Sequence, residues 1–177
     1  MEQKIDMIVN RLPAKTWNRL SVNQAEIKDL TADGWQRPAV TVRYPKDEKP
    51  IVRELTTEQE SSVYKKMEQI RTGMGAEVSR LKPEDATDIC VETVEEGGES
   101  DERRERMRRD EVVLVLDYPD RKNCFQDVKI YARAGESVTV WTVVRSKKDA
   151  EGKAVLRTLL QAEENAKIRL VQVDLLG

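Results

Sequence analysis

Two stretches that align with each other decide the fold: residues 129–143, KIYARAGESVTVWTV, and residues 159–173, LLQAEENAKIRLVQV. A shift of 30 residues superimposes them and places Ile130 on Leu160. The same shift places Gly135 on Asn165, and Gly and Asn are the residue types that best tolerate a positive φ. Each stretch therefore predicts a strand, a turn and a second strand. Their recurrence indicates stacked turns of a β-solenoid, and two hairpins of a β-sandwich are the alternative that two copies leave open.

Residues 154–167 pose a conflict within this pattern, because Ala, Leu, Glu, Gln and Lys dominate them and all favour a helix. The alignment instead predicts a strand, a turn at Asn165 and the start of another strand. Residues 168–173 are strongly β in character, which favours the alignment. The chain then ends on a strand whose Leu175 and Leu176 form an apolar edge. Such an edge indicates either a piece of a longer chain or an edge covered by a partner, and it suggests a homodimer through this strand.

Three further strands are expected before the repeat, over residues 39–44, 87–94 and 112–116. The last of these is a continuous apolar run that fits a strand covered on both faces. Residues 95–111 contain a single apolar side chain, Met107, and predict a solvated, charged loop between two strands.

The first part of the chain carries helical signals. Apolar residues at positions 5, 8, 9 and 12 have helical spacing, and Asn23 is a candidate N-cap for a short helix over residues 23–30. Thr57 and Glu60 have capping-box spacing ahead of an apolar stripe that Gly73 ends, and another short helix is expected near Pro83. We therefore expect a mixed, helical region over residues 1–85 and a β-rich core over residues 86–177, in a mainly β protein with an α-helical N-terminal part.

Composition excludes several classes of protein. The chain has 177 residues, 31 basic and 33 acidic side chains, and no histidine. Without histidine, Ser-His-Asp and Cys-His nucleophiles, HExxH zinc sites and imidazole proton shuttles are excluded. The near-neutral net charge of −2 gives no field that would attract nucleic acid or an acidic membrane. No transmembrane run or signal peptide is apparent, so a cytoplasmic location is expected.

Three segments carry a resemblance to a known family: residues 12–27, LPAKTWNRLSVNQAEI; residues 72–78, TGMGAEV; and residues 161–176, QAEENAKIRLVQVDLL. They resemble the N-terminal portion of the SufB/SufD family of iron–sulfur cluster assembly scaffold proteins. The resemblance implies a right-handed parallel β-helix core. It also implies pairing with a SufB/SufD-like paralogue and with a SufC-like ABC ATPase, on a platform where an iron–sulfur cluster is built.

Members of this family are much longer than this chain. The cysteine and histidine residues implicated in their cluster chemistry, and their ATPase-binding region, lie C-terminal to the part that this sequence resembles. No functional residue of the family can therefore be placed on a position here. The expectation is a chain without a cofactor of its own, with an iron–sulfur cluster only in the full complex.

Cys90 and Cys124 are the only soft metal ligands in the chain. An iron–sulfur cluster normally uses four thiolates, so two cysteines per chain would serve only where two chains share the site. The favoured interpretation is that both are small buried hydrophobic residues. Trp17 is a candidate partner anchor, against the favoured alternative that it docks the N-terminal arm on its own core.

Other patterns are weaker. The arginines among residues 103–109 are interleaved with acidic residues and indicate a solvated loop rather than a nucleic-acid site. Gly73 and Gly75 indicate the end of a helix rather than a phosphate loop. The acidic pairs Glu163–Glu164 and Asp117–Asp120 indicate surface solvation rather than acid/base catalysis.

We therefore expect a non-catalytic scaffold that acts through protein–protein interaction. A stand-alone β-rich peptide-binding module and a small carboxylate-dependent hydrolase are the alternatives. A hydrolase would need a deep pocket that holds carboxylates of raised pKa.

Overall fold

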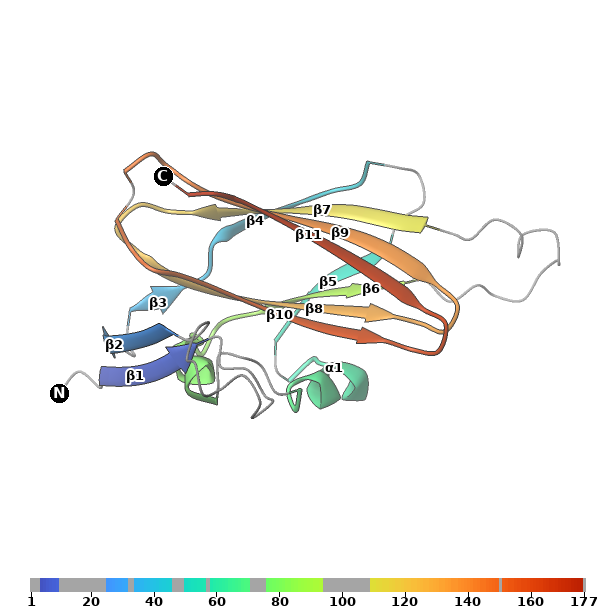
Figure 1. Ribbon diagram of the computed structural model, residues 1–177, viewed down its shortest axis with the longest axis horizontal. Helices are drawn as coiled ribbons and strands as arrows, with labels where there is room; N and C mark the ends of the chain where they lie inside the picture. Colours follow the sequence, from blue (N-terminus) through green and yellow to red (C-terminus); the bar gives the residue numbers. More distant parts are fainter. Residues whose placement is uncertain are drawn as a thin grey trace, which may run out of the picture.

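The described part of the chain folds mainly as β-strands, most of which form two curled sheets that face each other (Figure 1), while one pair of strands forms a separate small sheet. The computed structural model describes residues 4–9, 25–31, 34–45, 50–56, 58–70, 76–93, 109–149 and 151–176. The strands are β1 (Lys4–Val9), β2 (Ala25–Thr31), β3 (Trp35–Gln36), β4 (Ala39–Arg43), β5 (Ile51–Leu55), β6 (Asp88–Glu92), β7 (Arg109–Tyr118), β8 (Asn123–Ala132), β9 (Ser137–Ser146), β10 (Ala154–Ala162) and β11 (Lys167–Leu175). The helices are α1 (Ser62–Met67) and the 3-10 helix η2 (Ala76–Leu81).

From β6 to β11 the chain alternates between the two large sheets. One sheet, here called the β8 sheet, has the order β10-β8-β6-β5, and β3 also pairs with β8. The other, here called the β9 sheet, has the order β11-β9-β7-β4. The strands β6, β8 and β10 are parallel to one another in the first sheet, and β7, β9 and β11 are parallel in the second.

The 30-residue alignment is confirmed as the register of the last two strand pairs. Ile130 lies beside Leu160 in β8 and β10, and Val138 lies beside Ile168 in β9 and β11. The corners stack as well, because the Glu163 amide donates to the Ala132 carbonyl in the preceding turn.

Gly135 and Asn165 have φ values of +78° and +57°, so both corners use the left-handed conformation that the sequence predicts. Residues 154–167 contain strand β10 and the turn into β11, and the helix that their composition favours does not form.

Opposite the last strands, antiparallel strands close the stack. In the β9 sheet β4 pairs with β7, and in the β8 sheet β5 pairs with β6. The strands expected over residues 39–44, 87–94 and 112–116 are confirmed as β4, β6 and part of β7, whereas β5 was not predicted.

The interior between the sheets is built from alternate residues of each strand. Its buried members are Ile89, Val91, Val112, Leu114, Leu116, Tyr118, Cys124, Val128, Ile130, Ala132, Val138, Val140 and Val144. The strand covered on both faces is β8, in which every residue after Asn123 is buried. In β7, where such coverage was expected, Val113 stays partly exposed.

The expectation of an α-helical N-terminal part is wrong. Residues 4–9 form strand β1, and residues 25–31, expected in a helix capped by Asn23, form its antiparallel partner β2. In β1, the alternate residues Ile5 and Met7 are buried and pack against Phe125 on the outer face of β8. In a segment of six residues the helical and strand periods both fit the apolar pattern, and the tertiary contact decides between them.

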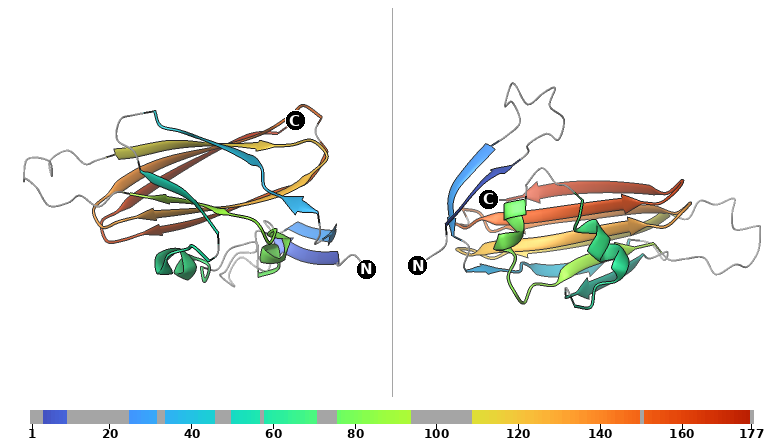
Figure 2. Two further views of the ribbon diagram at one scale, coloured as in Figure 1. Left: turned by 180° about the vertical axis from the view of Figure 1, so that it is seen from behind. Right: turned by 90° about the horizontal axis from the view of Figure 1, so that it is seen from below.

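The helix expected after Thr57 is present only in part. Thr57 lies outside the described residues, and α1 begins after its N-cap residue, Ser61. The helix expected near Pro83 is instead η2, which ends before that proline, and the Ala86 amide closes a turn on the Pro83 carbonyl. Both helices cross the outer face of the β8 sheet (Figure 2). Neither helix of the described ranges has the length and apolar character that a membrane span requires.

Candidate functional site

A cluster of buried charges lies on the outer face of the β8 sheet, beneath α1 and η2. Neighbouring strands bring Asp88, Lys129 and Arg157 together, because side chains that point outward alternate with those of the core. The segment that carries α1 adds Glu60 and Glu68 on either side of the helix. All of these side chains except Glu68 are almost completely buried.

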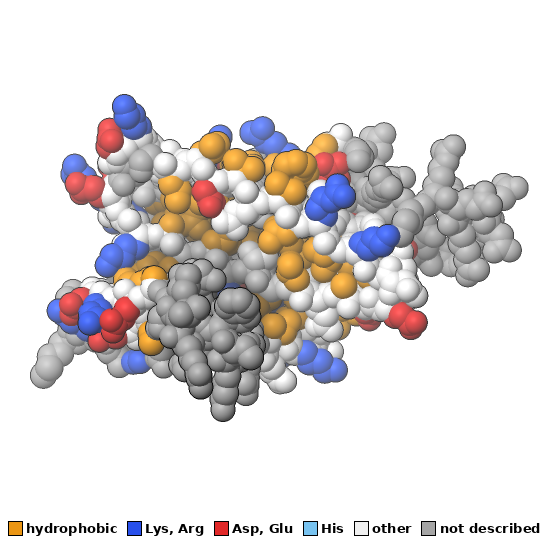
Figure 3. All heavy atoms as spheres, viewed as in Figure 1, with side chains coloured by type: hydrophobic (Ala, Val, Ile, Leu, Met, Phe, Trp, Pro, Cys, Tyr) orange, Lys and Arg blue, Asp and Glu red, His pale blue; other side chains and the backbone are white. Residues whose placement is uncertain are grey.

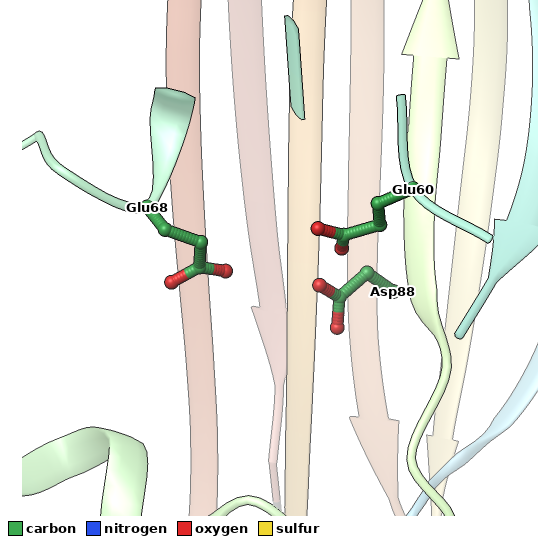
Figure 4. Close-up of side chains that lie close together, drawn as sticks. All are labelled: Glu60, Glu68 and Asp88. Carbon is green, nitrogen blue, oxygen red and sulfur yellow. The ribbon is translucent and has the colours of Figure 1, made fainter. Parts of the chain in front are cut away.

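Lys129 is the centre of this cluster. Its Nζ lies 2.5 Å from Oε1 of Glu60, 2.9 Å from Oε1 of Glu68 and 2.8 Å from Oδ2 of Asp88. Figure 4 shows the three carboxylates converging, with Glu60 and Asp88 close together and Glu68 facing them. Lys82 reaches Asp88 from the other side, with its Nζ 2.7 Å from Oδ1.

Arg157 extends the cluster along β10. Its Nε and Nη2 donate to the two carboxylate oxygens of Asp127 at 2.7 and 2.5 Å, which is the bidentate geometry of strong arginine–carboxylate pairs. Its Nη2 also donates to Glu68, and its Nη1 donates to Oγ of Ser79 in η2 at 2.9 Å. Glu68 therefore bridges Lys129 and Arg157, and the cluster joins the covering segment to three strands.

The protonation of the cluster follows from its geometry. Burial, together with a hydrogen bond to Asp88, raises the pKa of Glu60. Burial alone would also raise the pKa of Asp88, but hydrogen bonds with Glu60, Lys129 and Lys82 hold it below its ordinary value. Burial alone would lower the pKa of Lys129, but the three carboxylates around it outweigh this effect and raise the pKa. Lys129 therefore remains an ammonium. Of the two carboxyls that share this hydrogen bond, Glu60 is thus the one that takes up a proton first.

The three carboxylates that surround Lys129 have oxygens within 4.8 Å of one another, as a divalent cation would require. Carboxylate oxygens suit Mg²⁺ or Ca²⁺. However, the Lys129 ammonium already bonds to all three groups, and a metal there would leave a buried ammonium beside a second cation. The arrangement therefore serves to fasten the covering segment to the sheet, and Lys129 is no nucleophile because it stays protonated.

Cys90 and Cys124 are free, buried thiols that face opposite sides of the β8 sheet. Cys90 packs on the outer side with Tyr64 and Met67, whereas Cys124 belongs to the interior. Burial raises the pKa of Cys90 to about 12 and also raises the pKa of Cys124, which keeps both as thiols. Two thiols on opposite faces of one sheet cannot ligate one metal ion within the chain.

Among the acidic residues considered for acid/base chemistry, Glu163 and Asp117 have a lowered rather than a raised pKa. The Tyr131 hydroxyl and the Ala134 amide donate to Glu163 and hold its pKa below the ordinary value. Arg145 does the same for Asp117. A catalytic acid needs a raised pKa, so these residues do not fit that role. Trp17, Gly73, Gly75 and the arginines at positions 103–108 lie outside the described residues.

The second candidate site is the edge formed by β10 and β11, here called the open edge. Each sheet ends on one of these strands, so among the described residues their outward amides and carbonyls have no strand partner. Leu156, Ile168 and Leu170 of the last turn are only partly buried, and Leu160 is 43% exposed. Figure 3 views this side and shows hydrophobic side chains across its middle with charged ones around them.

Sequence reasoning anticipated the open edge but missed the charge cluster. One signal for it exists, because the same 30-residue shift that aligns the strands also places Asp127 on Arg157. Opposite charges at one repeat position inside apolar strands indicate a buried pair. Comparison of the chain with protein-family models, with curated proteins and with solved structures finds no match.

Proposed function

We propose that this chain is an interaction scaffold that works through protein–protein contacts rather than catalysis. Its role would be that of a SufB/SufD-like subunit in a cytoplasmic iron–sulfur cluster assembly complex. In this proposal its sheets are the first turns of a right-handed parallel β-helix. The partners are a SufB/SufD-like paralogue or a second copy of the chain, and a SufC-like ABC ATPase acts in the full complex.

The parallel strands support the β-helix in preference to a sandwich. Three neighbouring strands are parallel in each sheet, and from β6 to β11 the chain passes from one sheet to the other at every corner. Sandwiches are built from antiparallel sheets with hairpin or Greek-key connections. The last two strands of each sheet follow one another with a register of 30 residues, which is the arrangement expected of successive turns of a β-helix.

The open edge is the observation that carries the proposal. Two strands of nine residues each, β10 and β11, present backbone groups that no other described strand pairs with, on either side of an apolar interior. Native proteins rarely leave such edges uncovered, because the edges capture other strands. A further turn of β-strand, from a paralogue or from another copy, would continue both sheets and bury the exposed apolar side chains.

A matched pair of substitutions tests this function. Leu160→Glu places a charge at the centre of the open edge, and Ile8→Glu places one on β1, where the side chain is 42% exposed against 43% for Leu160. Each variant would be co-expressed with the paralogue and the ATPase. The complexes would then be isolated and their masses measured by analytical ultracentrifugation.

We expect Leu160→Glu to lose the paralogue or the second copy while it stays folded, since Leu160 is already partly in water. Ile8→Glu should assemble as the unsubstituted chain does. Equal assembly of the two variants, or failure of the unsubstituted chain to bind either partner, would contradict the proposal.

The stand-alone peptide-binding module uses the same edge and is distinguished by the ligand. An extended peptide would add a single strand to β10 or β11. Saturable binding of short, unrelated β-forming peptides, without assembly with the paralogue, would favour this second function.

A further inference from the structure

The inward side of the open edge changes in polarity along β11. Its first inward residues, Ile168 and Leu170, pack against the core between the sheets. The alternation of the strand places Gln172 and Asp174 on the same side. Their contact agrees with this placement, since Nε2 of Gln172 donates to both carboxylate oxygens of Asp174 at 3.1 Å. The open edge is therefore apolar along the first half of β11 and polar along the second.

The polar half of the edge continues into the interior. Gln126 of β8 and Thr142 of β9 are almost completely buried and face inward, and Thr142 lies beside Gln172 in the register. Burial raises the pKa of Tyr118, and the negative charge of Asp174 raises it further, so these two side chains are neighbours. The Tyr118 hydroxyl, Oε1 of Gln126 and Oγ1 of Thr142 have no hydrogen-bond partner within the described part of the chain.

The strands of the last two turns bring no positive charge to Asp174. Their basic residues all lie on the outward sides of the sheets, where strand alternation places Lys129, Arg145, Arg157, Lys167 and Arg169. The inward neighbours Tyr118, Gln126 and Thr142 are neutral. Asp174 is exposed to water, which stabilises its charge only while the edge is open.

Covering the open edge changes the environment of this carboxylate, and the inference that follows rests on the proposed function. A strand laid beside β11 would remove Asp174 from water, and a carboxylate without water needs a cation and hydrogen-bond donors. We infer that the covering strand belongs to a different chain that carries Lys or Arg in register with Asp174. Apolar side chains of that strand lie in register with Ile168 and Leu170.

A second copy of the chain does not meet this requirement. The inward residues of its β10 and β11 are those of the same open edge, and none of them is basic. Its own Asp174 would add another carboxylate to the interior without a cation for either. The position of Asp174 thus opposes self-pairing and favours a chain with the complementary charge.

The test uses nine-residue peptides as probes of the covering strand. The peptide TITLTQTKT, laid parallel to β11, has Ile, Leu, Gln and Lys on its inward side. Two control peptides replace this Lys by Leu or Glu, and a fourth has the sequence of β11 to represent a second copy. Binding of each labelled peptide to the whole chain would be measured by fluorescence anisotropy at low ionic strength. The chain variants are Asp174→Asn and, as the control at an exposed turn position, Asp149→Asn.

We expect the Lys peptide to bind saturably and about tenfold more tightly than the Leu peptide, as a hydrogen bond between charged groups implies. The Glu peptide and the β11 peptide should bind more weakly than either. Asp174→Asn should abolish the preference for Lys, and Asp149→Asn should retain it.

Equal affinity of the Lys and Leu peptides, absence of saturable binding, a preference for Lys that survives in Asp174→Asn, or tighter binding of the β11 peptide overturns the inference. These outcomes are distinguishable from failure of the proposed function. A chain that assembles with the paralogue through Leu160 but shows no preference for the Lys peptide contradicts only the inference. A chain that does not assemble contradicts the proposed function itself.

Discussion

Two arginine–aspartate pairs lie on the two outward faces of the stacked sheets, and only one of them is buried. Arg157 binds Asp127 across β10 and β8, and Arg145 binds Asp117 across β9 and β7. The side chains of the first pair are 7% and 0% exposed, and those of the second are 48% and 38% exposed. The same pairing chemistry therefore sits in two different dielectric environments of one fold.

The difference comes from what covers each face. On the β8 sheet α1, η2 and the β1–β2 hairpin form a second layer, and the charges beneath them must find partners within the protein. On the β9 sheet no described element lies over Arg145, and water screens the pair. The comparison teaches that a cross-strand ion pair determines stability here only where a covering segment removes it from water.

The largest effect is expected from Lys129→Met. The substitution leaves the buried carboxylates of Glu60 and Asp88 without their central cation, and breaking a buried ion pair from one side costs about 3–5 kcal/mol. Urea unfolding followed by tryptophan fluorescence would measure the loss. Lys148→Met, at an exposed position in the turn after β9, is the control and should unfold at the unsubstituted midpoint.

A smaller loss is expected from Arg157→Met. Asp127 would lose its bidentate partner, but Lys82 remains 3.5 Å from its Oδ2 and supplies part of the missing charge. We expect a loss of about 2–3 kcal/mol in the free energy of unfolding, measured in the same urea titration. The double substitution Arg157→Met with Asp127→Leu should recover part of the loss, because no uncompensated charge then remains. A double variant less stable than Arg157→Met would contradict this account.

The repeat could be predicted from the sequence because its signals are local and periodic. Val128, Ile130 and Ala132 alternate with residues of the other face, and Gly135 and Asn165 mark the corners by their backbone preference. The Asp127–Arg157 pair could have been predicted in the same way, because the same 30-residue shift aligns its two residues. The 30-residue period thus contains the signal for both the strands and half of the charge cluster.

The other half of the cluster depends on how distant segments cross. Glu60 lies 69 positions before Lys129, and their contact depends on the path of the α1 segment over the β8 sheet. No local pattern encodes that path, and the capping-box spacing at Glu60 suggested a different role. The prediction of a helix in place of β1 was wrong for a related reason. Ile5 and Met7 are buried by a long-range contact with Phe125, and the segment is too short for its apolar pattern to distinguish a strand from a helix.

Acid titration should separate the two carboxyls that share a hydrogen bond. The pKa of Asp88 is lowered in the folded chain, so its stabilising contribution is present above its ordinary value of 3.8 and is lost as the pH falls through the folded value. The pKa of Glu60 is raised, so its ionised form opposes folding above the folded value, and this opposition disappears below its ordinary value of 4.5.

Two isosteric variants test these opposite signs. At pH 7.5 Asp88→Asn should be less stable by about 2 kcal/mol, whereas Glu60→Gln should be equal to or more stable than the unsubstituted chain. The difference for Glu60→Gln should disappear as the pH falls below 4.5, whereas the difference for Asp88→Asn should persist at pH 4 and shrink only below 3.8, measured by urea unfolding at several pH values. If Glu60→Gln were the more damaging variant at pH 7.5, the proton would belong to Asp88 and the assignment would be reversed.

The smallest effect is expected from Arg145→Met, the exposed counterpart of Arg157→Met. Its partner Asp117 is exposed to water, so the loss of the arginine leaves no desolvated charge behind, and the unfolding midpoint should not change measurably. Salt should be equally without effect on this difference, because water already screens the pair. A destabilisation as large as that of Arg157→Met, particularly one that grows with protein concentration, would mean that another chain covers the outer face of the β9 sheet in solution. The contrast between the two pairs would then reflect assembly rather than the fold of one chain.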